Sequence, residues 1–310
     1  MNVTPRTLVW LTMLLLSVSC VDAAELTPSE KSLQEILGPG TPDPIPLWTT
    51  EIPEFKTDAP PETVEARGTI RMVSVPTISP YLAPADKATG MAIVVCAGGG
   101  YGGLDWKTHV VYAAQVFNPL GVAVIGLKYR TRPPNGTTNA DIQRIALLDA
   151  QRAIRLVRHR AAEWKLDPRQ VGIAGYSAGA NLAINSAANF DSGRADATDP
   201  IERLSCRPDF AIGAATWHWR QRESPFRFQA TAPPVFLLHA TNDGINGGAP
   251  IELPKAIAAD LQQLGVPVKL AIFDEGGHGV GNLIPQRVKN GFPPSQWPQL
   301  FLEWYRHLPR

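Results

Sequence analysis

The sequence predicts an α/β protein built on a mostly parallel sheet, and two features of its hydrophobic pattern indicate this. First, six short apolar runs are typical of strands, and most are continuous, as expected for strands covered on both faces. Second, helical patterns separate these runs, which predicts parallel strands joined by right-handed crossovers with helices on both faces of the sheet. The expected strands are residues 91–96, 122–128, 171–174, 211–216, 235–239 and 268–273, with an antiparallel edge strand at residues 69–75.

A long amphipathic helix is expected to begin near Asp141. Apolar residues recur there at the spacing of one helix face, and a row of arginines occupies the other side, which predicts that the arginines face solvent. These arginines are Arg144, Arg152, Arg155 and Arg158. The other expected helices cover residues 109–117, 178–188, 253–264 and 296–307.

Length and composition suit a globular protein and exclude some partners. A chain of 310 residues with 44% hydrophobic and 18% charged residues can bury a sizeable core as one α/β domain. The formal net charge of +1 predicts no nucleic-acid partner, because it offers no strongly basic surface. No clustered Cys/His pattern indicates a metal, and the Gly-rich segment matches neither a P-loop nor a dinucleotide fingerprint. We therefore expect no cofactor.

The first 24 residues resemble an export signal. A positive charge at Arg6 precedes an apolar run at residues 8–18 and small side chains that predict cleavage near Ala23 or Ala24. That run is shorter than the roughly 20 apolar residues of a membrane helix. We expect a periplasmic or extracellular protein with no stable membrane span after cleavage, and Cys20 leaves open a lipoprotein.

The remaining chain divides into an arm and a catalytic domain. Residues 25–68 are rich in Pro, Glu and Thr and predict an extended N-terminal arm, and residues 69–310 carry the strand and helix pattern. Removal of the signal leaves Cys96 and Cys206. Two cysteines make no disulfide scaffold, and their pairing stays open, with two small buried residues as the simpler expectation.

The motif that carries chemistry is GYSAG at residues 175–179. It lies directly after the expected strand at 171–174 and directly before an expected helix, which is the context of a nucleophile elbow. Such an elbow holds a serine in a strained turn, where the helix N-terminus directs partial positive charge at developing negative charge. Ser177 is therefore the predicted nucleophile.

A serine nucleophile needs a base, and the base should follow it in the chain with an acid between them. His278 lies in a glycine-flanked loop just past the strand at 268–273, whereas His307 falls in the last expected helix. We therefore predict His278 as the base. Asp243 is the only carboxylate in the turn after residues 235–239, so it is the predicted acid, with Asp274 and Glu275 as alternatives.

Backbone amides should stabilise the oxyanion that forms when the serine attacks a carbonyl group. Ala178 supplies one amide as the residue after the nucleophile. The second is expected from Gly99 or Gly100, in the glycine run after the strand at 91–96.

Aromatic residues near these loops are candidate substrate contacts. Trp217 and Trp219 lie between two expected strands, and they offer a platform for a sugar ring or an aromatic acyl group. Tyr101, Trp106 and Tyr176 lie beside the glycine run or the nucleophile. Each of these side chains has packing in the core as its alternative role.

Over residues 45–305 the chain resembles the α/β-hydrolase esterases that include bacterial acetylxylan esterases and bifunctional acetyl/feruloyl esterases. The motifs are VVCAGGGY at 94–101, LKYR at 127–130, DAQRA at 149–153, GYSAG at 175–179, RPDF at 207–210 and GGHG at 276–279. The resemblance implies the α/β-hydrolase fold, a small cap between the strands at 211–216 and 235–239, and a triad of Ser177, Asp243 and His278. The chain departs from the family pattern at residues 105–109, at Asn242 and at residues 216–219, which puts the acyl and alcohol specificity in doubt.

The expected function is a secreted serine carboxylic ester hydrolase that removes acetyl or other short acyl groups from carbohydrates or simple esters. Two alternatives are compatible with the same motifs: a serine peptidase or amidase on the same fold, and a non-catalytic binding protein. Fold alone does not separate them.

Overall fold

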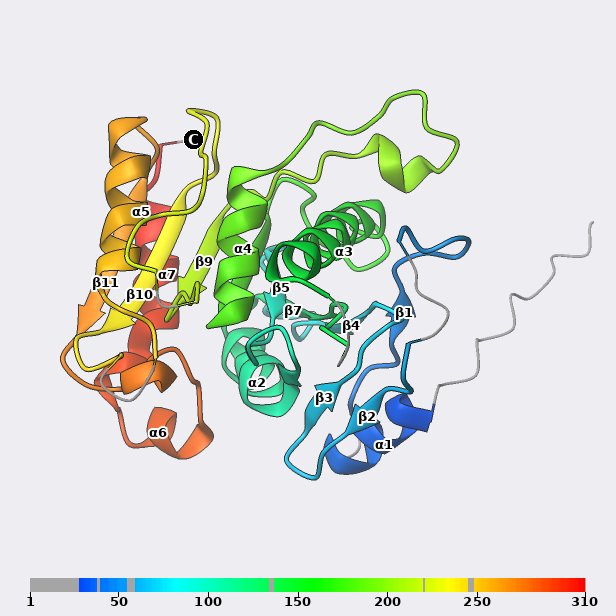
Figure 1. The fold of residues 1–310 in the computed structure, drawn as a ribbon, viewed down its shortest axis with the longest axis horizontal. Coiled ribbons are helices and arrows are strands. Elements are labelled where there is room, and N and C mark those ends of the chain that lie inside the picture. The colour runs from blue at the N-terminus through cyan, green and yellow to red at the C-terminus, as the bar shows by residue number, and fades with distance from the viewer. Residues whose placement is uncertain are drawn as a thin grey trace, which may run out of the picture.

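An eight-stranded sheet forms the centre of the molecule (Figure 1). The computed structural model describes residues 28–37, 40–54, 59–133, 137–219, 221–244 and 248–309. Along the sheet, the strands run in the order β1 (Ile45–Pro46), β4 (Thr77–Tyr81), β7 (Ala123–Lys128), β5 (Ala92–Cys96), β8 (Val171–Tyr176), β9 (Ala211–Ala214), β10 (Val235–Ala240) and β11 (Val268–Phe273). The order of the strands brings the loops after β5, β8, β10 and β11 to one edge of the sheet.

The strands from β7 to β11 pair in parallel, which confirms the predicted mostly parallel sheet. Every residue of β5, β7, β8, β9 and β10 is buried, as their continuous apolar runs predict. β11 lies at the end of the sheet and mixes exposed and half-buried residues.

The antiparallel edge lies elsewhere than predicted. β1 and β4 form it, whereas residues 69–71, inside the expected edge strand, belong to a small separate sheet of β2 (Thr63–Val64), β3 (Thr69–Arg71) and β6 (Leu104–Asp105). β4 contains Pro80, which weakens a strand pattern in the sequence. β1 pairs only with Thr77 and Ile78, so Pro80, which lacks an amide hydrogen, lies past the end of β1.

The main helices are α2 (Tyr112–Phe117), α3 (Asn139–His159), α4 (Ala178–Ala188), α5 (Glu252–Gln263), α6 (Pro285–Lys289) and α7 (Trp297–Arg306). In Figure 1, α3 and α4 lie in front of the sheet and α7 lies behind it. A π-helix at Lys107–Val111 precedes α2, where one continuous helix was expected. Short 3-10 turns lie at Asn118–Leu120, Pro200–Arg203, Gly277–Gly279 and Pro293–Gln296.

Two expected segments differ from the structure. The N-terminal arm, predicted to be extended, contains the helix α1 (Pro28–Leu37) before β1 in its described part. The expected small cap is not a structured unit in the described residues, because 215–219 and 221–234 contain only turns and irregular chain between β9 and β10. The boundaries of the arm and the catalytic domain remain predictions.

The arginine row of α3 does not face solvent as predicted. Arg152 and Arg155 are buried, and each pairs with acidic residues of the segment that follows α4. Arg158 pairs with Asp209 at 2.8 Å. Only Arg144 has a half-exposed side chain. The acidic partners are Asp191, Asp199 and Glu202, which lie 36 to 50 positions further along the chain and therefore give no local signal.

A buried ion pair links the end of β7 to α3. Arg130 donates to both carboxylate oxygens of Asp149, which is fully buried, and the shortest of these contacts is 2.6 Å. The guanidinium also lies 5.6 Å from the centre of the Trp48 ring. This pair explains why LKYR and DAQRA occur together in the sequence. A buried pair of this kind fixes local geometry more than it adds stability.

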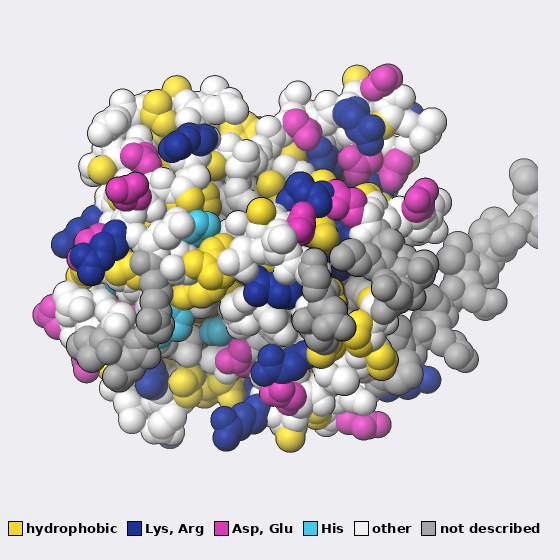
Figure 2. All heavy atoms as spheres, in the orientation of Figure 1, with side chains coloured by type: hydrophobic (Ala, Val, Ile, Leu, Met, Phe, Trp, Pro, Cys, Tyr) yellow, Lys and Arg dark blue, Asp and Glu magenta, His cyan; other side chains and the backbone are white. Residues whose placement is uncertain are grey.

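Several expectations concern residues 1–24, which lie outside the described part of the chain; they include the export signal and Cys20. Across the described ranges, no helix combines the length and the apolar character that crossing a membrane requires. Cys96 and Cys206 are both buried free thiols, so they do not pair with each other. On the face shown in Figure 2, acidic and basic side chains are interspersed.

Candidate active site

Ser177 occupies a strained turn between β8 and α4. Its backbone has φ 55° and ψ −118°, and its amide donates to the Ala214 carbonyl at 2.9 Å. The two glycines of the motif allow this turn. A Cβ on Gly175 would lie 2.0 Å from the Gly179 oxygen, and a Cβ on Gly179 would lie 2.1 Å from the Cys96 oxygen. Any larger residue would therefore push the elbow away from β5.

His278 lies within hydrogen-bond distance of the serine. Its Nε2 is 2.7 Å from Ser177 Oγ, although the two residues are 101 positions apart. The loop after β11 positions the His278 ring. Gly276 in this loop has φ 116°, a backbone conformation that favours glycine. Asn242 helps to fix this loop, because its side-chain oxygen accepts from the Gly277 amide at 2.8 Å. The side chain of His278 is 40% exposed, so a substrate can reach it.

Asp243 lies behind His278 and is buried. Its Oδ2 is 3.0 Å from His278 Nδ1, and its Oδ1 accepts from the amides of Gly244 at 2.8 Å and Ala249 at 3.0 Å. A carboxylate that accepts from Nδ1–H leaves Nε2 free to accept the serine proton. The hydrogen-bond partner of His278 is thus Asp243 rather than Asp274 or Glu275. His307 bonds to Glu303 at the end of α7, apart from this group.

A second histidine, His239, lies against the acid. Its Nε2 donates to the Ala249 carbonyl at 3.1 Å and lies 3.6 Å from Asp243 Oδ2. Burial lowers the pKa of His239, and the nearby Asp243 carboxylate opposes this effect. Burial has the larger effect, so the His239 ring remains neutral and does not compete with His278 for the Asp243 carboxylate as a charged partner.

The glycine-rich loop after β5 passes close to the serine. A Cβ on Gly98 would lie 3.1 Å from the Cβ of Ser177. Tyr129 holds the start of this loop, because its hydroxyl donates to the Ala97 carbonyl at 2.6 Å. Within the described residues, the amides of Gly99, Gly100 and Ala178 have no protein acceptor, as the predicted oxyanion donors require.

Three of the predicted aromatic contacts gather beside the serine. Trp219 stacks on Tyr101 with ring centres 6.1 Å apart and planes 4° from parallel, and Trp217 lies 5.0 Å from Trp219. The Trp217 amide donates to the Ser177 carbonyl at 3.2 Å, so this segment adjoins the elbow. Both tryptophans are partly exposed, whereas Tyr101 is fully buried and packs against the ring of Trp219.

Backbone strain gathers at the same place. Of the non-glycine residues described, seven have positive φ, and Tyr101, Ser177, Ala215 and Trp219 are four of them. Such conformations cost free energy and persist where the surrounding structure enforces them, which is typical of functional sites.

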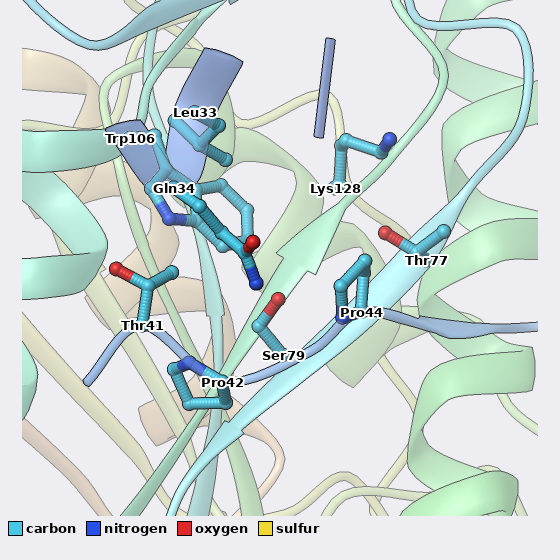
Figure 3. A pocket seen from close by; sticks show the side chains of 9 residues that line it. All are labelled: Leu33, Gln34, Thr41, Pro42, Pro44, Thr77, Ser79, Trp106 and Lys128. Carbon is cyan, nitrogen blue, oxygen red and sulfur yellow. The ribbon is translucent and has the colours of Figure 1, made fainter. Parts of the chain in front are cut away.

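The other two predicted aromatic contacts, Trp106 and Tyr176, are buried. Trp106 is 1% exposed and lines a small pocket with Leu33 and Gln34 of α1 (Figure 3). Its indole also packs against Gly126 of β7, so it belongs to the core between sheet and arm. Tyr176 is 4% exposed, and its ring stacks on His109 with ring centres 4.5 Å apart.

A polar network behind the aromatic wall was not predicted. Asn181, fully buried on the first turn of α4, accepts from the Tyr101 hydroxyl at 2.8 Å and from the Gln143 side chain at 2.9 Å. Its amide nitrogen lies 2.8 Å from His218 Nδ1. Burial lowers the pKa of His218, which keeps the ring neutral and able to accept. Only the spacing of Asn181, one helical turn after the serine, could have suggested its place.

Two further residues near the site were also missed, His109 and Asn282. They hydrogen bond to each other at 3.1 Å between Nε2 and Oδ1, across 173 positions of the chain. No grouping of His, Cys, Asp and Glu suited to a metal ion occurs among the residues described.

Comparison with known proteins gives one family and several relatives. The BD-FAE family model matches residues 79–205, a segment that includes Ser177 and ends before Asp243. An acetylxylan esterase from Xylanibacter ruminicola is 36% identical over 99 residues, which cover 32% of this chain and 19% of that protein. Endo-1,4-beta-xylanase B from Butyrivibrio fibrisolvens is 24% identical over 229 residues, covering 66% of this chain and 35% of that protein. The matched part of this chain thus spans about a third or less of these two relatives.

Solved structures extend the similarity to the whole fold. An acetyl ester-xyloside bifunctional hydrolase from Caldicellulosiruptor lactoaceticus is 28% identical with a TM-score of 0.67, over 87% of this chain and 98% of that one. A Thermogutta terrifontis esterase with butyrate bound is 22% identical with a TM-score of 0.56, over 74% and 89%, and shows the fold alone. The sheet order and these similarities agree with the motifs in the sequence. Together, the family model, the acetylxylan esterase and the bifunctional hydrolase support an acetylxylan esterase-like family for this chain, on an α/β-hydrolase fold.

Proposed function

We propose that this protein is a serine carboxylic ester hydrolase that removes acetyl or other short acyl groups from carbohydrates or simple alcohols. The observation that carries the proposal is the 2.7 Å contact between Ser177 Oγ and His278 Nε2, with His278 Nδ1 held at 3.0 Å by Asp243. This arrangement supplies the nucleophile, the base and the group that orients the base. The similarity to an acetylxylan esterase supports an ester as the bond that is cleaved.

In the proposed first half-reaction, the Ser177 hydroxyl donates its proton to His278 Nε2 as Oγ bonds to the ester carbonyl carbon. The carbonyl oxygen becomes negatively charged and accepts from the amide of Ala178 and from that of Gly99 or Gly100. Asp243 stabilises the imidazolium that forms. When the carbon–oxygen bond to the alcohol breaks, His278 returns the proton to the leaving alkoxide, and the acyl group stays on Ser177.

In the second half-reaction, a water molecule takes the place of the alcohol. It loses a proton to His278 Nε2 and attacks the acyl carbon, and the same amides accept the oxyanion charge. The bond to Ser177 Oγ then breaks, and His278 returns the proton to the serine. The products are a carboxylic acid and free enzyme, with no metal or organic cofactor required.

The aromatic wall supports a carbohydrate alcohol as one substrate class. Trp217 and Trp219 are partly exposed beside the elbow, and their faces offer apolar stacking for a sugar ring. Neutral polar groups at His218 and Gln143 lie next to this surface, where sugar hydroxyls need partners.

An ester panel tests the proposed reaction and its acyl specificity. We expect purified protein to hydrolyse p-nitrophenyl acetate and acetylated xylan, with kcat/KM falling by about tenfold or more for each few carbons beyond propionyl, because each added methylene must find room in the pocket. Methyl ferulate tests an aromatic acyl group, and peptide p-nitroanilides test amide cleavage. Cleavage of the anilides without cleavage of any ester would contradict the proposal in favour of a peptidase.

We also propose that the protein is exported. The support is the charge, the apolar run and the small residues before position 24. N-terminal sequencing of protein produced with its full leader should begin near residue 24, and a species that retains Met1 would contradict export. A mature chain that begins at a lipid-modified Cys20 would identify the lipoprotein instead.

A further inference from the structure

His109 makes three contacts around the serine that no sequence motif predicts. Its Nδ1 lies 3.1 Å from the Gly98 amide, at the start of the glycine-rich loop. Its Nε2 lies 3.1 Å from the Asn282 side-chain oxygen, just past the 3-10 turn that carries His278. Its ring stacks on Tyr176, the residue before the nucleophile. One imidazole therefore contacts the glycine-rich loop, the loop that follows His278 and the end of β8.

These contacts fix the protonation of the ring. A backbone amide can only donate, so Nδ1 must carry the lone pair and Nε2 the proton, which it donates to Asn282 Oδ1. Burial lowers the pKa of His109 to about 4, so the neutral form persists at ordinary pH. A charged ring would carry a proton on Nδ1 and lose the bond to Gly98.

The bond to Gly98 determines which amides remain for a substrate. Because His109 takes the Gly98 amide, the first free amide of the loop is that of Gly99. Gly98 is buried and so close to the serine that its Cβ position lies 3.3 Å from His109 Cε1 and 3.1 Å from Ser177 Cβ. A shift of the Gly98 peptide would therefore move the next two amides relative to Ser177 Oγ.

The local helix supports this role. His109 lies in the π-helix Lys107–Val111, which a Tyr112 amide closes onto the Lys107 carbonyl. A π-turn inserts one residue into a helix and is frequent at functional sites. Here it brings a 9% exposed histidine under the glycine-rich loop.

We propose that His109 is a positioning residue for the oxyanion hole: its neutral imidazole holds the Gly98 peptide against the nucleophile elbow and, through Asn282, against the loop of His278. The proposal rests on the proposed esterase function. In this role His109 does not contact the substrate. Replacing its side chain should therefore reduce the stabilisation of the transition state and leave substrate binding unchanged.

Two substitutions of His109 separate its hydrogen bonds from its packing. His109→Phe keeps a ring on Tyr176 and removes both hydrogen bonds, and His109→Asn can place an oxygen near the position of Nδ1. We expect His109→Phe to lower kcat on p-nitrophenyl acetate about 100-fold with KM within about threefold, as expected for misplaced oxyanion donors. His109→Asn should recover at least about tenfold of that loss, because it restores an acceptor for Gly98.

A second measurement reports the oxyanion hole directly. A trifluoromethyl ketone adds to Ser177 Oγ as a hemiketal whose negatively charged oxygen occupies that site, so its inhibition constant should rise with His109→Phe in parallel with the fall in kcat/KM. Unchanged inhibition by the ketone, or a His109→Asn enzyme no better than His109→Phe, would overturn the proposal.

Controls keep the outcome independent of folding and of the proposed function. Ser186→Ala removes a buried hydrogen bond on α4, from Oγ to the Leu182 carbonyl, and should keep wild-type kcat. If His109→Phe does not fold, Asn282→Ala removes only the Nε2 partner and should lower kcat about tenfold at constant KM, whereas wild-type kcat there would overturn the proposal. A wild-type enzyme that cleaves no ester refutes the proposed function itself. Ester cleavage with no effect of His109→Phe refutes only the role of His109.

Discussion

Ser177→Ala is expected to lower kcat on p-nitrophenyl acetate by about 10⁵-fold or more, to the level of background hydrolysis. In the proposed reaction Ser177 Oγ forms the covalent bond to the acyl group, and His278 Nε2 lies 2.7 Å from it. Alanine is smaller than serine, so it fits the elbow without a clash. The substitution also leaves the backbone hydrogen bonds of the elbow in place. Initial rates with purified protein measure the effect, and circular dichroism checks the fold.

The matched control is Ser186→Ala on the same helix, which removes a buried hydroxyl outside the site. It should retain wild-type kcat. If Ser177→Ala retained activity to within tenfold of wild type, another residue would be the nucleophile, and the assignment of Ser177 would be wrong.

Asp243→Asn is expected to lower kcat by about 10⁴-fold while KM changes little. The amide can offer Nδ2 as a donor to His278 Nδ1, which favours the tautomer that carries its proton on Nε2. That tautomer cannot accept the serine proton, so the geometry persists and the base is lost. Steady-state kinetics at several pH values measures the effect.

Asp274→Asn provides the comparison, because Asp274 is exposed and was the alternative acid in the sequence. It should behave like wild type. A large loss of kcat in Asp274→Asn together with a small one in Asp243→Asn would reverse the assignment of the acid.

Much of the fold was predictable because burial leaves a direct mark on the sequence. β5, β7, β8 and β10 are covered on both faces, so each appears as an unbroken apolar run. The elbow was predictable for a different reason: Gly175 and Gly179 lie so close to neighbouring backbone that no side chain fits, which fixes a recognisable motif. Asp243 and His278 could be predicted because each lies in the loop directly after a recognisable strand, and such loops meet at one edge of a parallel sheet.

Other features could not be predicted because they depend on contacts between distant residues. Arg152 and Arg155 lie on the polar side of an amphipathic helix, a pattern that predicts exposure to solvent. Both are buried instead, because they form ion pairs with acidic residues 36 to 50 positions away. His109 bonds to Asn282 across 173 positions, and the π-turn that orients it has no sequence signature. Trp106 was expected near the substrate, but α1 covers it, which the pattern of the arm did not reveal.

Labelling with a fluorophosphonate tests whether Ser177 is an activated nucleophile, because the reagent bonds to a serine whose neighbouring base has activated it. We expect one adduct per chain, mapped by mass spectrometry to the peptide that contains Ser177, and we expect the adduct to disappear in His278→Gln. If wild-type protein stayed unlabelled, or if the adduct lay on a different serine, Ser177 would not be the nucleophile.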